Sequence, residues 1–469
     1  MATEVDRGAV ARSRATPAPG SGATSTAPDG GPRSGDDLEA PPESFGARIR
    51  RLRRALGLTQ QQLAEPRYSR AYLAALEAGV RIPTDEVLRH IAARLDTDPD
   101  DLRYGRPPGV AVALVGELNE SRRALSRGEL DSAAATLLRV RDQAERYGLV
   151  ELAGWVGYYT AEIQLHRGET ATAAHHYEQL ATELPDGATA LRAAVVGRQA
   201  YCLLIGGSAT RAVALLEGAL RTLRDSPAAD PDAELRLTNA LMYTFLELDW
   251  RDRARRLERQ ALPLLSRVGN QEWVAQFYAV AGQLRRSGDE LDEVERYLTE
   301  AGRRYVELGL TRELALCHWA RGYVLRRAGR PDEAVAELHK ARDILGDVGA
   351  VQDQAGATLE LAEALRQVGS LDEAYELATV AAATSLANGH AEGMAEADRL
   401  LGRVAAARGE RDNAERLLRR AADRYEQADL MADVVSCCRQ LGELLLEWGR
   451  LQEAREAFQR GLRAAERLR

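Results

Sequence analysis

The sequence predicts an all-α protein in which a small five-helix domain precedes an α-solenoid of about nine helical hairpins. Three observations predict this fold class. Ala, Leu, Arg and Glu are abundant, while aromatic residues make up only 5% of the 469 residues, a composition that favours helices over strands. Residues 44–104 contain five short segments with helical periodicity and capping signals. From about residue 110 onward, a turn motif recurs roughly every 40 residues.

The N-terminal segment, residues 1–42, is rich in Ala, Pro, Gly, Ser and Thr and has hardly any large apolar side chains. Such a segment cannot bury enough surface to offset its chain entropy, so we expect it to be disordered. Charge is distributed unevenly over the rest of the chain. Residues 41–107 carry 12 Arg and 9 acidic residues, a net charge of +3, whereas the whole chain carries −8. Only the small domain therefore has the charge to approach phosphates.

Five helices are expected in the small domain, residues 43–106. The first spans about residues 45–56, and the side chains on its apolar face are Phe45, Ile49, Leu52 and Leu56. Capping residues mark where the other four begin: Thr59 with Gln62 in a capping box, then Ser69, Thr84 and Asp98. Residues 107–112 contain Pro and Gly and are interpreted as a linker.

The remaining residues, 113–469, are predicted to form the solenoid. A Gly-x-x-x-x-Ala turn has clear copies that begin at Gly128, Gly168, Gly329, Gly369, Gly409 and Gly449, and weaker copies at Gly207, Asp249 and Asp289. Successive copies lie 39 to 42 residues apart. Small residues keep a fixed distance from each turn, which lets the two helices of a hairpin approach closely. The pattern resembles the tetratricopeptide repeat, lengthened from its usual ~34 residues.

Six short motifs in residues 44–104 point to a family. They are Ile49-Arg-Arg-Leu-Arg53, Leu58-Thr-Gln60, Leu63-Ala64, Ser69-Arg-Ala-Tyr72, Leu76-Glu77 and Gly79-Val-Arg-Ile-Pro83. Together they resemble the Xre class of bacterial and phage repressors, which bind DNA through a helix-turn-helix. The resemblance implies that the third helix enters the major groove. The turn before that helix, residues 65–68, departs from the family pattern because it is one residue short and lacks Gly.

The resemblance assigns DNA contacts to eight residues: Gln60, Ser69, Arg70, Ala71, Tyr72, Arg81, Arg48 and Arg51. Gln60 and Arg81 are placed for phosphates. Residues 69–72 open the recognition helix, so their side chains face the bases, and Arg70 can pair with a guanine edge. Arg48 and Arg51 belong to an arginine run on the first helix. That run either touches phosphate or is simply a solvated helix face.

The resemblance also bears on partners and function. A single domain of this size is small, so a homodimer on a palindromic double-stranded DNA site is expected. Chains that join an Xre domain to tetratricopeptide repeats resemble Gram-positive sensors that bind signalling peptides in the solenoid groove, and similar actinobacterial proteins are common. We therefore expect a transcriptional regulator whose solenoid senses a small molecule, a peptide or a protein partner. The alternative is an interaction scaffold whose DNA-binding domain is vestigial or non-specific.

Aromatic residues suggest where an effector would bind. Fifteen lie between residues 150 and 325, against four in the 144 residues that follow. Tyr and Trp are typical of binding surfaces, which favours a ligand groove in repeats two to five. Alternatively, the same aromatics fill the cores of the least regular repeats. The candidate ligand contacts are Tyr158, Tyr159, Tyr201, Asn239, Tyr243, Trp273, Phe277 and Trp319. Asn239 is included because asparagines clamp the peptide backbone in the peptide sensors.

The sequence contains no recognisable catalytic or metal-binding motif. P-loop, GxSxG and HExxH motifs are absent. The four cysteines form no CxxC motif and are expected to be buried, reduced thiols. His175 and His176 project about 100° apart on a helix, so they are not expected to share an ion. With no apolar run of ~20 residues and no signal peptide, we expect a cytoplasmic protein without enzyme activity, cofactor, metal or membrane association.

Overall fold

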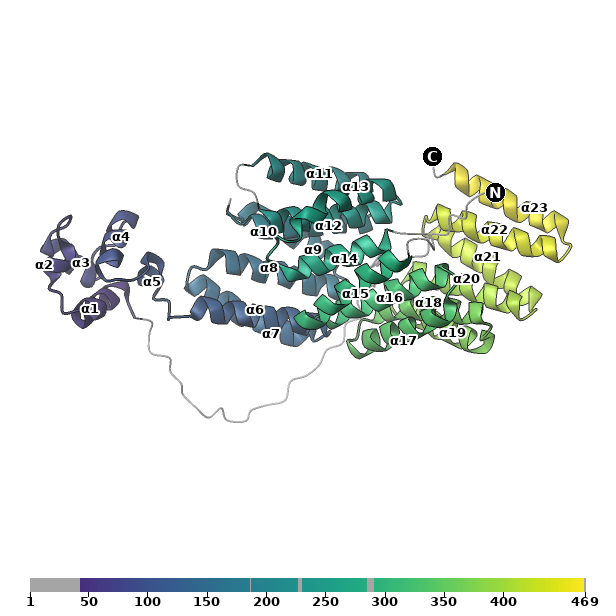
Figure 1. The fold of residues 1–469 in the computed structure, drawn as a ribbon, viewed down its shortest axis with the longest axis horizontal. Coiled ribbons are helices and arrows are strands. Elements are labelled where there is room, and N and C mark those ends of the chain that lie inside the picture. The colour runs from purple at the N-terminus through teal and green to yellow at the C-terminus, as the bar shows by residue number, and fades with distance from the viewer. Residues whose placement is uncertain (1–42, 186, 227–229, 285–290, 468–469) are drawn as a thin grey trace, which may run out of the picture. The chain divides into compact units, whose positions relative to one another are not determined.

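The computed structural model describes residues 43–185, 187–226, 230–284 and 291–467, most of which are helical (Figure 1). Within these ranges there is no β-strand, which confirms the predicted all-α fold class. The disorder expected for residues 1–42 concerns a segment outside the described residues, as does the turn copy at Asp289. No helix in the described ranges is both long and apolar enough to cross a membrane.

Five helices form the small domain: α1 Phe45–Ala55, α2 Gln60–Ala64, α3 Arg70–Glu77, α4 Asp85–Arg94 and α5 Pro99–Tyr104. The residues whose side chains accept a backbone N–H at the start of each helix are Ser44, Thr59, Ser69, Thr84 and Asp98. The predicted capping box of Thr59 and Gln62 is present. Leu56 differs from the expectation, because α1 ends at Ala55 and leaves Leu56 52% exposed.

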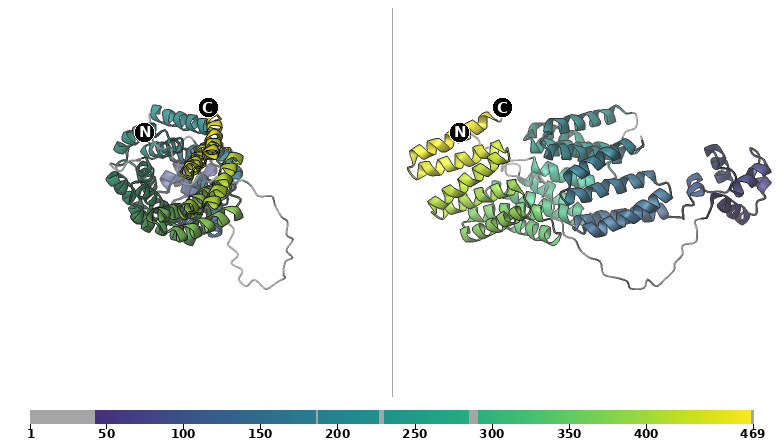
Figure 2. Two further views of the ribbon diagram at one scale, coloured as in Figure 1. Left: turned by 90° about the vertical axis from the view of Figure 1, so that its right-hand side faces the viewer. Right: turned by 180° about the vertical axis from the view of Figure 1, so that it is seen from behind.

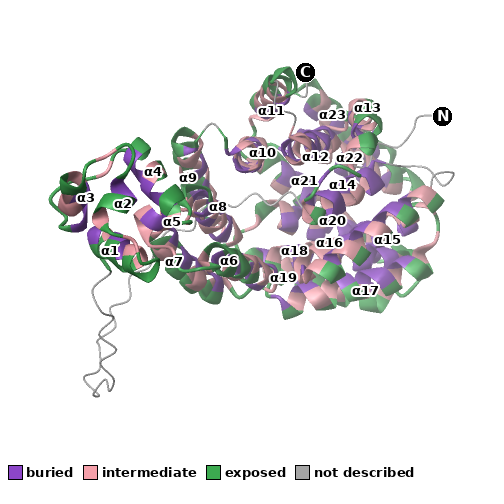
Figure 3. Ribbon diagram, turned by 60° about the vertical axis from the view of Figure 1, so that its left-hand side comes forward, coloured by how far each residue is buried: buried purple, intermediate pink, exposed green. Residues whose placement is uncertain are grey.

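The core of the small domain draws on all five helices. Its fully or nearly fully buried side chains are Ile49, Leu63, Leu73, Leu76, Val87, Leu88, Ile91, Leu95 and Leu102. Figure 3 shows buried and exposed residues on different sides of these helices. One side of α3 faces the core, whereas Ser69, Arg70 and Ala71 at its N-terminal turn are exposed and Tyr72, Ala74 and Ala75 are half-buried.

Within the described ranges, the helices after the small domain form nine hairpins, as predicted from the turn motif. Figures 1 and 2 show how consecutive hairpins stack. Their helices are α6 Val110–Ser126, α7 Leu130–Arg146, α8 Val150–His166, α9 Thr170–Glu183, α10 Thr189–Ile205, α11 Ala209–Asp225, α12 Pro231–Glu247, α13 Arg251–Ala261 with the short 3₁₀ helix η1 Leu262–Leu264, α14 Gln271–Gln283, α15 Leu291–Leu308, α16 Thr311–Arg327, α17 Pro331–Asp347, α18 Val351–Val368, α19 Leu371–Ala387, α20 Ala391–Ala407, α21 Arg411–Gln427, α22 Met431–Glu447 and α23 Leu451–Glu466.

Close approach explains the small residue that lies seven positions before each turn. A Cβ built on Gly322 of α16 would lie 2.4 Å from Cγ of Leu338 on α17, and one on Gly402 of α20 would lie 2.8 Å from Cγ of Leu418 on α21. Neither position has room for a side chain unless the leucine moves. The turn itself also needs glycine, since Gly329 has a φ of +77°, a conformation that other residues rarely adopt.

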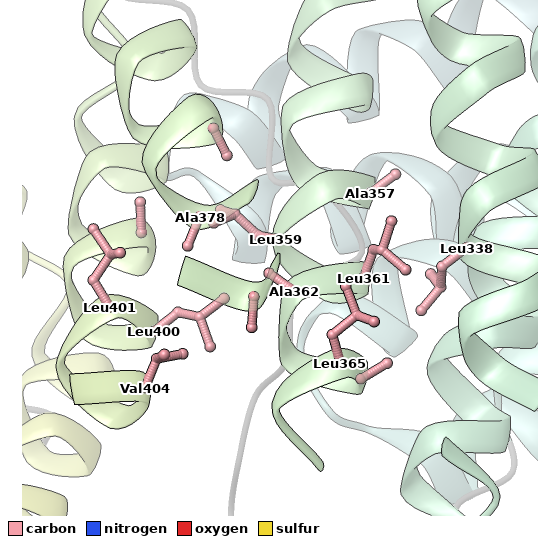
Figure 4. Close-up of a cluster of buried hydrophobic side chains, with 14 of the residues drawn as sticks. Leu338, Ala357, Leu359, Leu361, Ala362, Leu365, Ala378, Leu400, Leu401 and Val404 are labelled. Atoms are coloured by element: carbon pink, nitrogen blue, oxygen red, sulfur yellow. The ribbon is translucent and has the colours of Figure 1, made fainter. Parts of the chain in front are cut away.

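Helices α17 to α20 share one apolar core (Figure 4). Leu338 of α17, Leu361 and Leu365 of α18, and Leu400 and Val404 of α20 are buried in it. Alanines between these large side chains keep the helix backbones close together. Each hairpin therefore buries its apolar surface against its neighbours, as expected of a repeat protein.

The end of α6 and the turn after it contact helices that lie far away in the sequence. Arg122 Nη1 donates a hydrogen bond to Glu272 Oε2 of α14 at 2.6 Å. Ser126 Oγ accepts from the backbone N–H of Arg312 at 3.1 Å and donates to the carboxylate of Glu313 on α16. These contacts span 150 to 187 residues of sequence, so the end of α6 is held by α14 and α16.

Arg106 fixes the small domain to the turn between α7 and α8. Its guanidinium donates to the carbonyl oxygens of Tyr147 and Gly148 at 2.7 and 3.3 Å, and its Cζ lies 5.3 Å from the centre of the Tyr104 ring. The same ring fills the space beside Gly148, where an added Cβ would lie 2.4 Å from it. Helix α6 begins at Val110, within the expected linker 107–112, so the two domains are joined by only a few residues.

Candidate functional sites

The N-terminal turn of α3 is the first candidate site. Ser69 caps this helix, and its Oγ accepts the backbone N–H of Tyr72 at 3.2 Å. Arg70 and Ala71 follow and are exposed. In the described part of the chain, the Arg70 side chain has neither a hydrogen bond nor an ion pair. The partial positive charge of a helix N-terminus and a free guanidinium together attract anions.

Arg81 lies beside α3 although it follows that helix in the sequence. Its Cζ is 5.1 Å from the centre of the Tyr72 ring. That ring stacks on Tyr68, with centroids 5.5 Å apart and an angle of 22° between the planes. Tyr68 in turn meets the ring of His90 on α4 edge-on at 5.1 Å, and His90 Nε2 lies 3.2 Å from the carbonyl oxygen of Ala64. We call Tyr68, Tyr72 and His90 the aromatic stack.

Gln60 has a partner inside the domain. Its Nε2 donates to Glu77 Oε2 at 3.0 Å, and the same carboxylate accepts hydrogen bonds from Arg53 at 2.6 and 3.1 Å and from Arg50 at 3.4 Å. Burial raises the pKa of Glu77, but the bonds from Arg53 and Gln60 outweigh it and lower the pKa overall. This carboxylate ties α1, α2 and α3 together. The role of Glu77 was not predicted from the sequence, although an acidic residue directly after the apolar Leu76 of the Leu76-Glu77 motif was a signal for it.

Arg48 is part of the domain's interior, which corrects its assignment to DNA. The side chain is buried, and its guanidinium donates to the carbonyl oxygens of Leu102, Arg103 and Glu43 at 2.7, 3.1 and 2.8 Å. The physical reason is that the last carbonyls of a helix such as α5 lack helical partners and need a donor. Arg51 is exposed, but it donates to both carboxylate oxygens of Glu43 at 2.9 and 3.0 Å.

The predicted ligand contacts in the solenoid divide into two groups. Five are buried, between 0 and 6% exposed: Tyr158, Asn239, Trp273, Phe277 and Trp319. Asn239 Nδ2 donates to the main-chain oxygen of Trp273 at 2.8 Å, so it joins α12 to α14 and is not free to clamp a peptide. The buried group packs the repeats, which corrects its assignment to an open groove. The half-buried group consists of Tyr159, Tyr201 and Tyr243. Their role as ligand contacts stays a prediction.

A polar cluster lies among the helices that carry these tyrosines. We define it as Tyr158, Glu162, Tyr177, Arg198, Arg236 and Gln276. The carboxylate of Glu162 on α8 accepts hydrogen bonds from Arg198 of α10 and from the Tyr177 hydroxyl of α9. Arg236 of α12 donates to the Tyr158 hydroxyl at 3.2 Å and to Gln276 Oε1 of α14 at 2.7 Å. The cluster therefore links four consecutive repeats through side chains.

The polar cluster contains more hydrogen-bond donors than acceptors to pair with them. Burial raises the pKa of Glu162, but the charge of Arg198 and the hydrogen bond from Tyr177 outweigh it, so the pKa is lowered overall and the carboxylate stays ionised. The buried Nε atoms of Arg198 and Arg236 have no hydrogen-bond partner within the described residues. One carboxylate against two guanidiniums favours negatively charged or acceptor groups nearby.

Metal chemistry finds no support among the described residues. They contain no group of three or more His, Cys, Asp or Glu side chains able to hold an ion. The cysteines are buried free thiols, as predicted, and burial raises the pKa of both Cys317 and Cys437 to about 12. A protonated thiol is a poor nucleophile and a poor metal ligand. The rings of His175 and His176 lie 6.4 Å apart.

Comparison with known proteins supports both halves of the architecture. Residues 44–104 match the family described as helix-turn-helix domain. Comparison with curated protein sequences finds no match. Among solved structures, the chain is similar to the Rap protein complexed with Competence and Sporulation Factor, at 14% identity and a TM-score of 0.55, with 76% of this chain and 98% of that one covered.

Two further solved structures are similar. The apo form of the quorum sensor NprR from B. thuringiensis has 12% identity and a TM-score of 0.52, with 76% of this chain and 99% of that one covered. A signal transduction ATPase with a tetratricopeptide repeat sensor from Pyrococcus horikoshii has 13% identity and a TM-score of 0.51; the match covers 84% of this chain and 55% of that one. Such identities show the fold alone. The chain thus joins a helix-turn-helix domain to a solenoid of tetratricopeptide-like repeats.

Proposed function

We propose that the protein is a sequence-specific, DNA-binding transcriptional regulator whose solenoid senses an effector. The observation that carries the proposal is the pair of arginines, Arg70 and Arg81, at the exposed edge of α3. In the described part of α1–α5, the other arginines except Arg54 donate to a carboxylate or a carbonyl. A guanidinium without an internal partner is available to phosphate oxygens and guanine edges.

The solenoid supplies the proposed sensor. The half-buried tyrosines Tyr159, Tyr201 and Tyr243 and the donor-rich polar cluster favour an effector with acceptor or acidic groups, either a small molecule, a peptide or a segment of a protein partner. The similar Rap structure is a complex with Competence and Sporulation Factor, and NprR is named a quorum sensor. A coupling of about 1–3 kcal/mol between effector and DNA binding would change operator occupancy about 5- to 150-fold.

The proposed regulator binds DNA as a dimer. Two chains bind a palindromic site in the cytoplasm as a homodimer, because two half-sites give the specificity that one small domain lacks. The effector changes the affinity of the dimer for DNA, without catalysis and without a cofactor. The contact of Arg106 with the α7–α8 turn supports this proposal, because it joins the DNA-binding domain to the first helices of the solenoid.

Fluorescence anisotropy with labelled fragments of the protein's own promoter region tests the DNA-binding half. We expect sequence-selective binding that weakens steeply with salt, and at least a tenfold loss of affinity in Arg70→Ala. Arg139→Ala, which removes an exposed arginine of α7, is the matched control and should bind as the wild type does. The absence of salt-sensitive binding to any fragment would disprove the proposal.

A second candidate function is supported by one observation. Ala71, Ala74 and Ala75 give α3 few hydrogen-bonding side chains, as expected of an interaction scaffold with a vestigial or non-specific DNA-binding domain. A cellular reporter experiment with the double variant Arg70→Ala, Arg81→Ala separates the two functions. Lost regulation supports the DNA-binding regulator, whereas unchanged regulation supports the scaffold.

A further inference from the structure

In the loop after α3, the Arg81 guanidinium contacts the ring of Tyr72. Val80 and Ile82, on either side, are 77% and 91% exposed, so their side chains do not anchor the loop to the domain core. Arg81 itself is exposed, and it has no hydrogen bond or ion pair among the described residues. What holds it is the Tyr72 ring, 5.1 Å from its Cζ, a distance typical of a cation–π contact.

Neighbouring side chains hold the Tyr72 ring in place. Its ring packs on Tyr68 at 5.5 Å, Tyr68 meets His90 at 5.1 Å, and His90 lies on α4 against the carbonyl of Ala64. Both tyrosines are also packed against the domain core. Tyr68 itself belongs to the turn before α3. The aromatic stack thus connects the exposed loop to the rigid part of the domain.

From this geometry we infer that Tyr72 acts on DNA through Arg81: the aromatic stack is a platform that holds the Arg81 guanidinium ready for a backbone phosphate. Tyr72 is then a positioning residue and not a reader of bases. The inference rests on the proposed DNA-binding function and deepens it. It also assigns a purpose to Tyr68, which neither the helix-turn-helix motifs nor the expected DNA contacts include.

The chemistry of the guanidinium favours a phosphate at this position. A guanidinium that stacks on an aromatic ring uses its flat face and keeps the N–H groups at its edge free for hydrogen bonds. A phosphate accepts two such bonds side by side. A long arginine side chain that is already oriented loses less conformational freedom on binding than a free one. The Tyr72 ring already contacts Tyr68 and Arg81. Only its hydroxyl group would be available to hydrogen-bond to a base.

Anisotropy titrations of the full-length protein at several salt concentrations test the inference. Arg81→Ala should weaken binding about 3- to 10-fold on specific and non-specific DNA alike, and should lower the slope of log affinity against log salt by about one, the loss of one phosphate contact. Tyr72→Leu should reproduce most of both effects. In the Arg81→Ala background, Tyr72→Leu should add little further loss.

Tyr72→Phe is the decisive variant because it keeps the ring and removes only the hydroxyl. We expect wild-type affinity, salt slope and base preference across a set of operators with single base changes. A changed base preference would show that the hydroxyl reads a base and would overturn the inference, as would additive losses in the double variant. If Tyr72→Leu lowers the melting temperature, the DNA affinities and base preferences of Tyr72→Phe and Arg81→Ala still decide whether Tyr72 reads a base. Failure of the wild type to bind would overturn the proposed function itself.

Discussion

Two arginines at the edge of α3 and two arginines of the central solenoid have opposite surroundings. At the edge of α3, Arg70 and Arg81 lack a carboxylate partner within the described residues. In the solenoid, Arg198 donates to Glu162 and Arg122 donates to Glu272. The same side chain therefore has two uses: a guanidinium that binds an external anion stays unpaired in the free protein, whereas one that joins helices is neutralised inside the fold.

The largest expected effect comes from a carboxylate that neutralises arginines within the DNA-binding domain itself. Glu77→Gln removes the charge that Arg53 and Arg50 contact, and the Glu77 side chain is fully buried. Leaving a partly buried guanidinium without its partner should cost about 3 kcal/mol of domain stability. Amide hydrogen exchange of residues 45–104 should accelerate about 100-fold. Glu65→Gln, at an exposed position in the same domain, should leave the exchange unchanged.

A smaller loss is expected from the corresponding change in the solenoid. Glu162→Gln leaves Arg198 without an ionised partner, but 30% of the Arg198 side chain is exposed, so water compensates in part. The free energy of unfolding should fall by about 2 kcal/mol. Urea denaturation followed by tryptophan fluorescence measures this, because all tryptophans lie in the solenoid. Glu117→Gln, in an exposed pair with Arg139, is the control; equal losses in both variants would contradict the prediction.

The solenoid should also respond to pH through His166. Burial, reinforced by the charge of Arg312, lowers the pKa of His166 to about 4, against about 6.5 in the unfolded chain. Below pH 6.5 the unfolded chain therefore binds more protons than the folded one, so stability falls as the pH falls from about 6.5 towards 4. The loss at pH 5 should be about 1–2 kcal/mol. His166→Gln should flatten this part of the stability profile, and His175→Gln, at an exposed position, should not.

A weaker effect is expected when a paired arginine of the DNA-binding domain is made unpaired. Glu43→Gln removes the carboxylate that Arg51 contacts at 2.9 and 3.0 Å, and it raises the charge of the DNA-binding domain by one. Affinity for non-specific DNA at low salt should rise about 2- to 3-fold. Glu117→Gln makes the same change in net charge on the solenoid side of the chain and should have no such effect. A rise in both variants would mean that net charge, and not the position of the arginine, sets the affinity.

Features specified by neighbouring residues could be predicted from the sequence, and those that depend on distant elements could not. Capping by Thr59 with Gln62 and the turn glycines every 40 residues are local, so helix starts and hairpins were predicted correctly. The burial of Arg48 depends on carbonyls of α5 that lie more than 50 residues further along the chain. Asn239 likewise meets its partner only when α12 packs on α14. Periodicity identifies neither contact.

The α3 region shows the same limit within the functional site. The motifs brought Arg70, Tyr72 and Arg81 into one expected interface. They gave no indication that the Tyr72 ring contacts both Tyr68 and the Arg81 guanidinium, because Tyr68 belongs to a turn that departs from the family pattern. An i, i+4 pair of tyrosines meets on a helix surface, but here the first of the two lies before the helix begins.

The regular contacts of the last hairpins have a consequence for how this protein can change over evolutionary time. Gly322 with Leu338 and Gly402 with Leu418 are the same pair, 80 positions apart, in equivalent hairpins. An in-frame duplication or deletion of 40 codons in this part of the gene would give a new junction between two surfaces that already fit each other. Genes of this kind can therefore lengthen or shorten their solenoid by recombination, while the helix-turn-helix domain is left intact.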